Sequence, residues 1–167
     1  MAKEYIIPMN SVTVANASPV TCIFFQCMVT PPFAAIEVVR AVISQRGSTT
    51  PEMIGAQLGT QLTSFPTLTA QAPIAMKAGD PVSKLTGGTA GAAGTSGVNA
   101  SAEGAGAKTV VVPDSWNNQN GFLWAHTPRE TFIETAQSPV HGFFLAIPTA
   151  PSARTLFSAY LVIAELG

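Results

Sequence analysis

The sequence predicts an all-β fold, a β-sandwich or barrel. Hydrophobic residues recur mostly with a period of two, and prolines and glycines separate many short candidate strands, a pattern typical of these architectures. The 167 residues are expected to form one domain spanning positions 1–167. A compact chain of this size buries roughly 69% of the surface that its unfolded form exposes. We therefore expect a core that needs neither disulfides nor metals.

The clearest candidate strand is residues 154–165, where both faces of the alternating pattern are largely apolar. Such a strand is expected at the centre of a sheet, or with one face against a neighbour. Residues 20–29 and 35–45 are also long and rich in β-branched and aromatic side chains, and two prolines between them predict a turn. Shorter candidate strands cover residues 5–7, 11–15, 108–112, 122–125, 131–134 and 142–147.

Residues 50–62 depart from this pattern and predict one short helix. Pro51 stands at a favourable first helical position, and a capping-box pattern accompanies it. Four apolar residues follow at helical spacing, namely Met53, Ile54, Leu58 and Leu62. Gly55 and Gly59 weaken this helix by about 1 kcal/mol each relative to Ala. We expect the helix to cross between strands and cover an open end of the sandwich; a helix that binds a partner's groove is the alternative.

The most unusual stretch is residues 86–107, which read TGGTAGAAGTSGVNASAEGAGA. Nineteen of these 22 residues are Gly, Ala, Ser or Thr, so the stretch has almost no apolar side chain with which to build a core. We expect a long loop that leaves a single β-domain and is ordered by contact with a partner. A plain surface linker is the alternative. The stretch lacks the GK[ST] ending of a phosphate-binding loop and the three-residue period of collagen.

Charge is scarce in this chain. Only 10% of the residues are charged, against about 25% in ordinary soluble domains. Residues 5–36, 53–76 and 135–153 contain no Asp, Glu, Lys or Arg. Such a surface favours association. The balance of 8 basic and 9 acidic residues argues against nucleic acid as a partner. No apolar run reaches the ~18 residues of a membrane span, and the first residues do not form a standard secretory signal.

No constellation of residues predicts catalysis, so we expect a protein that is not an enzyme and binds no cofactor. His126 and His141 lack partners at metal-ligand spacing, and no metal site is predicted. Cys22 and Cys27 are expected to be two buried thiols, with an intersubunit bridge as the alternative. Two tryptophans, Trp116 and Trp124, flank a predicted tight turn. Core packing is the expected fate of these rings, and a sugar-binding face is the alternative.

Three stretches in the C-terminal part of the chain carry a resemblance: WNNQNGFLWAHTPRE, HGFFLAIPTAPSA and LVIAELG. Together they resemble a family of small β-rich structural proteins of tailed phages and prophages. That family has a Thr-Pro-(Arg/Glu)-Glu turn, matched at residues 127–130, and an ending Glu-Glu-(Leu/Ile)-Gly, matched at residues 164–167 apart from Ala164. The resemblance implies an antiparallel, jelly-roll-like β-sandwich and a role as a virion component, in particular a head decoration (cement) protein.

The sequence and the resemblance together predict a capsid decoration protein, made in a bacterial host's cytoplasm and bound to the capsid surface. It is expected to form a homo-oligomer, with a trimer favoured, and to bridge subunits of the major capsid protein, with neither nucleic acid nor membrane as a partner. The predicted contact residues are Gly88, Gly91, Gly94, Val98, Phe33 and Trp116. The alternatives are a glycan-binding fibre or tail module, a self-assembling filament or tube subunit, and a minor coat subunit.

Overall fold

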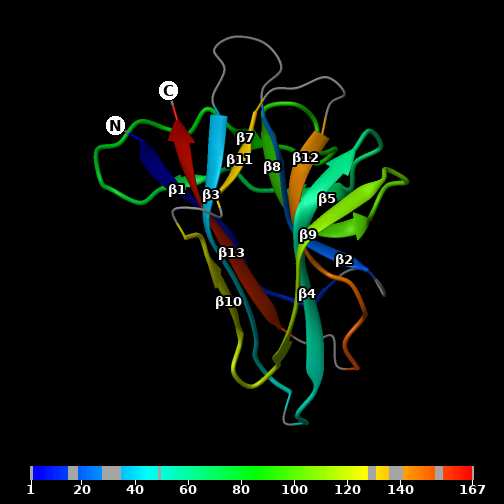
Figure 1. Cartoon of the computed structure of the whole chain (residues 1–167). Coiled ribbons are helices and arrows are strands. Elements are labelled where there is room, and N and C mark those ends of the chain that lie inside the picture. Colours follow the sequence, from blue (N-terminus) through cyan, green and yellow to red (C-terminus); the bar gives the residue numbers. More distant parts are fainter. Residues whose placement is uncertain are drawn as a thin grey trace.

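The computed structural model describes residues 2–14, 19–27, 35–48, 50–127, 131–135, 141–152 and 156–166. Across these ranges the chain is all β, with two sheets packed against each other as a sandwich (Figure 1). Every described strand pairing is antiparallel except the one between β7 and β8. The predicted antiparallel β-sandwich is therefore confirmed.

The first sheet, sheet A, has six strands, of which five form a continuous path. In spatial order these are β10 (Phe122–Ala125), β3 (Ala35–Gln45), β13 (Phe157–Leu166), β1 (Lys3–Val12) and β6 (Ile74–Ala75), while β11 (Phe132–Glu134) also pairs with β3. The second sheet, sheet B, has seven strands. Its order is β5 (Thr67–Ala70), β8 (Thr95–Ala102), β2 (Val20–Gln26), β12 (His141–Ile147), β4 (Met53–Leu62) and β9 (Lys108–Asn117), while β7 (Thr86–Gly87) also pairs with β8.

Eight of these strands define a jelly roll. Sheet A contains the order β10-β3-β13-β1 and sheet B the order β2-β12-β4-β9. Along the chain, the path crosses from one sheet to the other at every step among these eight except between β4 and β9. This arrangement is that of two interlocked Greek keys, the defining topology of jelly-roll sandwiches. The remaining strands of sheet B, β5, β7 and β8, come from an insertion between β4 and β9.

The main core fills the space between the two sheets. Alternating residues of β13, β3 and β1 point into it, as the period of two requires. Phe25 and Phe143 stack at its centre with ring centroids 5.5 Å apart. The two predicted buried thiols are confirmed, because Cys22 and Cys27 are both buried and neither forms a disulfide. Burial, with a smaller effect of Glu103, raises the pKa of the Cys22 thiol to about 12, so this thiol stays protonated and unreactive near neutral pH.

A second, smaller core lies on the outer side of sheet B. It consists of Phe24, Leu68, Ala100, Phe144 and Ala146, with Phe65 packed against them. Every residue of β2 is buried, and so is nearly all of β12. The insertion between β4 and β9 provides this cover, with the ring of Phe65 lying 5.4 Å from that of Phe24. Sheet B is therefore covered on both sides where β8, β2 and β12 run.

The predicted helix at residues 50–62 is wrong, because Met53–Leu62 forms strand β4 between β12 and β9. Two of the four apolar residues at helical spacing, Ile54 and Leu58, also fit a period of two. Ile54, Ala56 and Leu58 all point into the main core. Gly59 explains why the strand prevails, since a Cβ atom there would lie 2.1 Å from the carbonyl oxygen of Thr109 in β9. This glycine, unfavourable in a helix, permits close pairing of two strands.

The predicted long loop at residues 86–107 is also wrong in part. It contains β7 and the eight-residue strand β8, which pairs with β2 and with β5. Ser96, Val98 and Ala100 in this strand are buried. The segment therefore extends sheet B, where it pairs with strands of the same chain.

Candidate interaction surface

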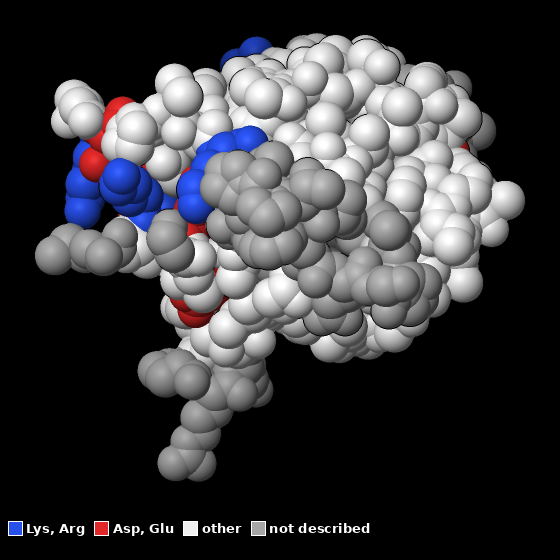
Figure 2. Space-filling view, turned by 90° about the horizontal axis from the view of Figure 1, so that it is seen from above, with Lys and Arg blue, Asp and Glu red and all other residues white. Residues whose placement is uncertain are grey.

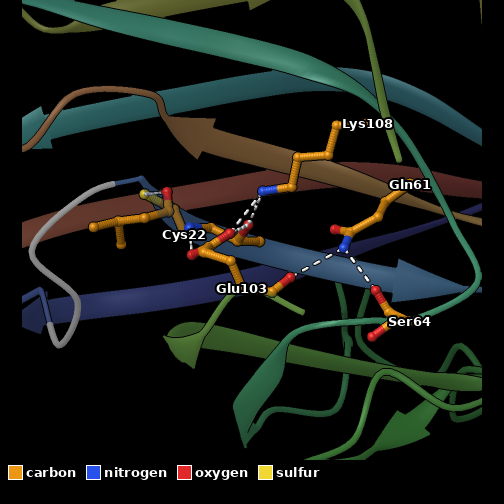
Figure 3. A network of polar contacts seen from close by, with 7 residues as sticks. Cys22, Gln61, Ser64, Glu103 and Lys108 are labelled. Carbon is orange, nitrogen blue, oxygen red and sulfur yellow. Dashed lines mark hydrogen bonds and ion pairs between the residues drawn. The ribbon is translucent and has the colours of Figure 1, made fainter. Parts of the chain in front are cut away.

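A polar network fastens the end of the insertion to sheet B (Figure 3). The carboxylate of Glu103 accepts hydrogen bonds from the backbone N–H of Thr21 at 2.7 Å and from its hydroxyl at 2.5 Å. It also pairs with the ammonium of Lys108 at 2.6 Å. That ammonium lies 5.0 Å from the centre of the Phe144 ring, above the second core. Both charged side chains are mostly buried, so each depends on the other for compensation.

Gln61 of β4 continues this network. Its side-chain N–H₂ group donates to the backbone oxygens of Ser64 at 2.9 Å and Glu103 at 3.0 Å. The backbone of Gly106 donates to the same Ser64 oxygen, and Leu62 donates to Ala107. Both ends of the insertion are thus bonded to β4 and to each other. The network therefore helps to hold the fold together.

We expect Glu103→Gln to lower the free energy of unfolding by about 2–3 kcal/mol, because it leaves the mostly buried Lys108 without its charge partner. Glu52→Gln is the control. That carboxylate accepts bonds from Ser152 in a more open setting, so its loss should cost less than about 1 kcal/mol. Urea unfolding followed by circular dichroism measures both values. Equal losses in the two variants would contradict the structural role of Glu103.

The structure gives the predicted contact glycines a role within the chain. Gly91 and Gly94 are buried and Gly88 is half-buried. A Cβ atom on Gly91 would lie 2.6 Å from the Cβ of Phe65, at the second core. The backbone N–H of Gly94 donates to Gln26 of β2, and that of Gly88 donates to Ser96 of β8. Contact of these glycines with a partner stays an untested prediction, but close packing on sheet B already accounts for them.

The other predicted contact residues differ in position. Val98 points into the main core, and Trp116 is only 5% exposed at its margin. Phe33 lies outside the described residues. The second tryptophan, Trp124, lines a half-open pocket of about 470 Å³ between β9 and the pair β10 and β11. The other lining residues are Val111, Val112, Thr131 and Phe132.

The outer side of sheet A contrasts with that of sheet B, because no described strand packs on it. The strand register arranges its side chains in rows. One row consists of Leu123, Val42, Tyr160 and Pro8. The next consists of Ala125, Arg40, Val162, Ile6 and Ile74. We call these nine residues the free face. Leu123 and Ile74, on the two edge strands, are 66% and 53% exposed, whereas Val162 on the central strand β13 is only 2% exposed.

Apart from Arg40, the free face carries no charge. The Arg40 guanidinium lies 5.8 Å from the centre of the Tyr160 ring, within cation–π range. The adjoining row contains Ile133, Glu37, Ala164 and Glu4. In it, the carboxylate of Glu37 lies 3.1 Å from Nδ1 of His126. Figure 2 shows that, seen from above, most visible charged side chains gather at the side of the molecule where both termini lie.

Sequence reasoning did not identify the free face as a surface, although one signal for it was present. Residues 154–165 are apolar on both faces, which predicts a central strand or a strand with one face against a neighbour. In the structure β13 is central in sheet A, and its outward Val162 and Ala164 are buried without belonging to either core. The signal therefore marked a face that has side chains suited to contact but no partner among the described strands.

Among the described residues, no group of three or more His, Cys, Asp or Glu side chains could hold a metal ion. The same residues include no helix that is long and apolar enough to cross a membrane. Comparisons with models of protein families, with curated proteins and with solved structures find no significant match to this chain. The phage resemblance therefore remains a hypothesis, and function must be argued from the fold and its surfaces.

Proposed function

We propose that this protein is a structural component of a virus particle that binds protein through the free face. The most specific form of this proposal is that the protein decorates the head of a tailed phage. The free face carries the proposal: one sheet of the jelly roll is covered by its own insertion, whereas the other presents an apolar, nearly uncharged surface. Contiguous apolar patches of several hundred Å² on soluble proteins typically mark interaction sites.

Two further observations support this role. Jelly rolls recur in viral capsid proteins, although a fold alone does not define a function. The resemblance in the C-terminal part of the chain points to the same class. In this role the protein stabilises a shell by mass action, because it binds the assembled state and thereby favours it. A homo-oligomer, for which the sequence predicts a trimer, would bridge neighbouring copies of the major capsid protein.

The test uses particles purified from a phage or prophage that encodes this chain. We expect mass spectrometry to find the protein at a copy number comparable to that of the coat protein, and electron microscopy to show it on the head. Particles that lack it should release their genome at a lower temperature, as measured with a nucleic-acid dye. Absence of the protein from purified particles would overturn the proposal.

The pocket at Trp124 favours one second candidate, a carbohydrate-binding module of a fibre or tail. Jelly rolls also occur in lectins, and the Trp124 and Phe132 rings, 5.3 Å apart, give this pocket an aromatic wall. A glycan array with wild-type protein and Trp124→Ala tests it. Binding lost in the variant would support this function, and no binding by wild type would exclude it for the sugars on the array.

A further inference from the structure

The turn between β9 and β10, residues 118–121, contains the one Asn-Gly sequence of the chain, at Asn120 and Gly121. Each of the other asparagines is followed by a residue that has a Cβ atom. The backbone nitrogen after an asparagine can attack the carbonyl carbon of the asparagine side chain, and a Cβ atom on the following residue hinders this approach. Glycine lacks that atom. The sequence therefore makes Asn120 the most reactive asparagine of the chain.

The structure leaves the side chain of Asn120 open to this reaction. Asn120 is exposed, and no described residue bonds to its amide group. Asn118, in the same turn, is only 3% exposed. Its amide group accepts from the backbone of Glu52 at 3.2 Å and donates to that of Thr50 at 2.9 Å. Asn117 accepts from the backbone N–H two residues further along the chain, at 3.0 Å. These two amide groups are held in place, whereas that of Asn120 can rotate.

The attacking nitrogen is held by one long hydrogen bond. The backbone N–H of Gly121 donates to the oxygen of Asn117 at 3.3 Å, beyond the usual range for such bonds. The N–H of Asn120 donates to the same oxygen at 2.9 Å, so the turn keeps its shorter bond when the longer one breaks. Breaking one long bond in an exposed turn costs little free energy. The nitrogen of Gly121 is thus accessible to its neighbour in the folded protein.

We propose that Asn120 is a site of spontaneous deamidation, independently of any role in a virus particle. The nitrogen of Gly121 bonds to Cγ of Asn120, and its proton passes through water to the leaving side-chain nitrogen. The Cγ–Nδ2 bond breaks, ammonia departs and a five-membered succinimide ring remains. Water then opens the ring at either carbonyl, which gives aspartate or isoaspartate. Water is the only co-reactant, and nothing is oxidised or reduced.

Both products alter the edge of sheet A. Each adds a negative charge to a region, residues 115–128, that contains no Asp, Glu, Lys or Arg. Isoaspartate also lengthens the backbone by one carbon atom just before β10. Phe122 begins that strand, packs in the main core and pairs with Ile43 of β3, so the longer backbone should weaken this pairing. Leu123 of the free face and Trp124 of the pocket follow in the same strand.

The first test follows purified protein during incubation in warm, mildly alkaline buffer. Trypsin cuts after Lys108 and Arg129 and releases residues 109–129, which contain three asparagines, as one peptide. Tandem mass spectrometry then assigns the mass change from amide to acid to one position. We expect Asn120 to react at least about tenfold faster than Asn117 or Asn118, because only Asn120 precedes a residue without a Cβ atom.

The excised peptide 109–129, incubated in the same buffer, is the control for the chemistry. An Asn120 that remains an amide in the folded protein while it reacts in this peptide would overturn the proposal. Equal reaction at all three asparagines of the folded protein would also overturn it.

The second test uses two variants at this position. Asn120→Gln keeps the amide, but its ring closure would give a six-membered ring, which forms much more slowly. After the same incubation it should contain no isoaspartate in residues 109–129, as detected with an enzyme that methylates isoaspartate. Asn120→Asp adds the charge without lengthening the backbone. Amide exchange in β10 should be faster in aged wild type than in fresh wild type or fresh Asn120→Asp. Isoaspartate in Asn120→Gln at the wild-type level would contradict the proposed site.

Discussion

Gly104→Ala is expected to lower the free energy of unfolding by about 3–5 kcal/mol, or to prevent folding of a marginally stable chain. Gly104 has φ +70°, and a Cβ atom there would lie 2.5 Å from the backbone oxygen of Phe65 and 2.6 Å from that of Ser64. Backbone atoms at those distances cannot move aside as a flexible side chain would. The two ends of the insertion would therefore have to move apart, although Gln61 of β4 bonds to both of them.

Gly79→Ala is the matched control for this substitution. Gly79 also has a left-handed backbone, with φ +92°, but nothing lies within 4 Å of the position that a Cβ atom would take there. The free energy of unfolding of this variant should fall only by the cost of left-handed backbone strain, about 1–2 kcal/mol. Chemical denaturation of both variants isolates the packing contribution as their difference. If Gly104→Ala were no less stable than Gly79→Ala, the two ends of the insertion would not be packed against each other as described.

Phe144→Ala is expected to cost about 3–5 kcal/mol, the range for removing a buried phenylalanine ring. Phe144 is fully buried although it points to the outer side of sheet B. Tyr160 occupies the corresponding place on sheet A, an outward aromatic residue on a central strand, but it is half-buried. Tyr160→Ala should cost less than about 1.5 kcal/mol, because its ring is only partly buried.

This pair of substitutions measures the asymmetry between the two outer faces. Urea denaturation measures the loss in each variant. Similar losses at the two positions would mean that both outer faces are equally covered. The free face would then not differ from the outer side of sheet B.

The sequence predicted strands well where the local pattern and the tertiary structure agree. The candidate strands at residues 35–45 and 122–125 match β3 and β10 in both bounds. Residues 5–7 and 11–15, predicted as two strands, instead contribute to one strand, β1, with an irregular register near its end, where Ser11 has φ 42°. A bulge of this kind interrupts the period of two without ending the strand.

Two elements could not be predicted because tertiary contacts decide them. Strand β4 has a pattern compatible with both a helix and a strand, and only the close approach of Thr109 shows why Gly59 is there. Strand β8 contains one large apolar residue, Val98, so it lacks the hydrophobic signal that marks a strand. Its small side chains suit a tightly packed place. A Cβ atom added to Gly97 would lie 2.7 Å from the side chain of Leu68.

The candidate site was less predictable than the fold. Scarcity of charge and the two-sided apolar pattern at residues 154–165 indicated association, but they did not reveal which surface is free. That depends on the insertion, which covers the outer side of sheet B, whereas no described strand packs on the outer side of sheet A. The bland composition of residues 86–107 suggested an arm for a partner, whereas the structure accounts for it by packing within the chain.

Hydrogen–deuterium exchange of the isolated protein tests most directly whether the insertion belongs to the fold. Amide groups of β8 (Thr95–Ala102) that bond to β2 should exchange slowly, with protection close to that of β2 and β12, because all three strands belong to one sheet. A loop awaiting a partner would exchange at nearly the rate of an unfolded chain. Slow exchange at β8 in the absence of any partner is the predicted result, and exchange at the unfolded rate would contradict it.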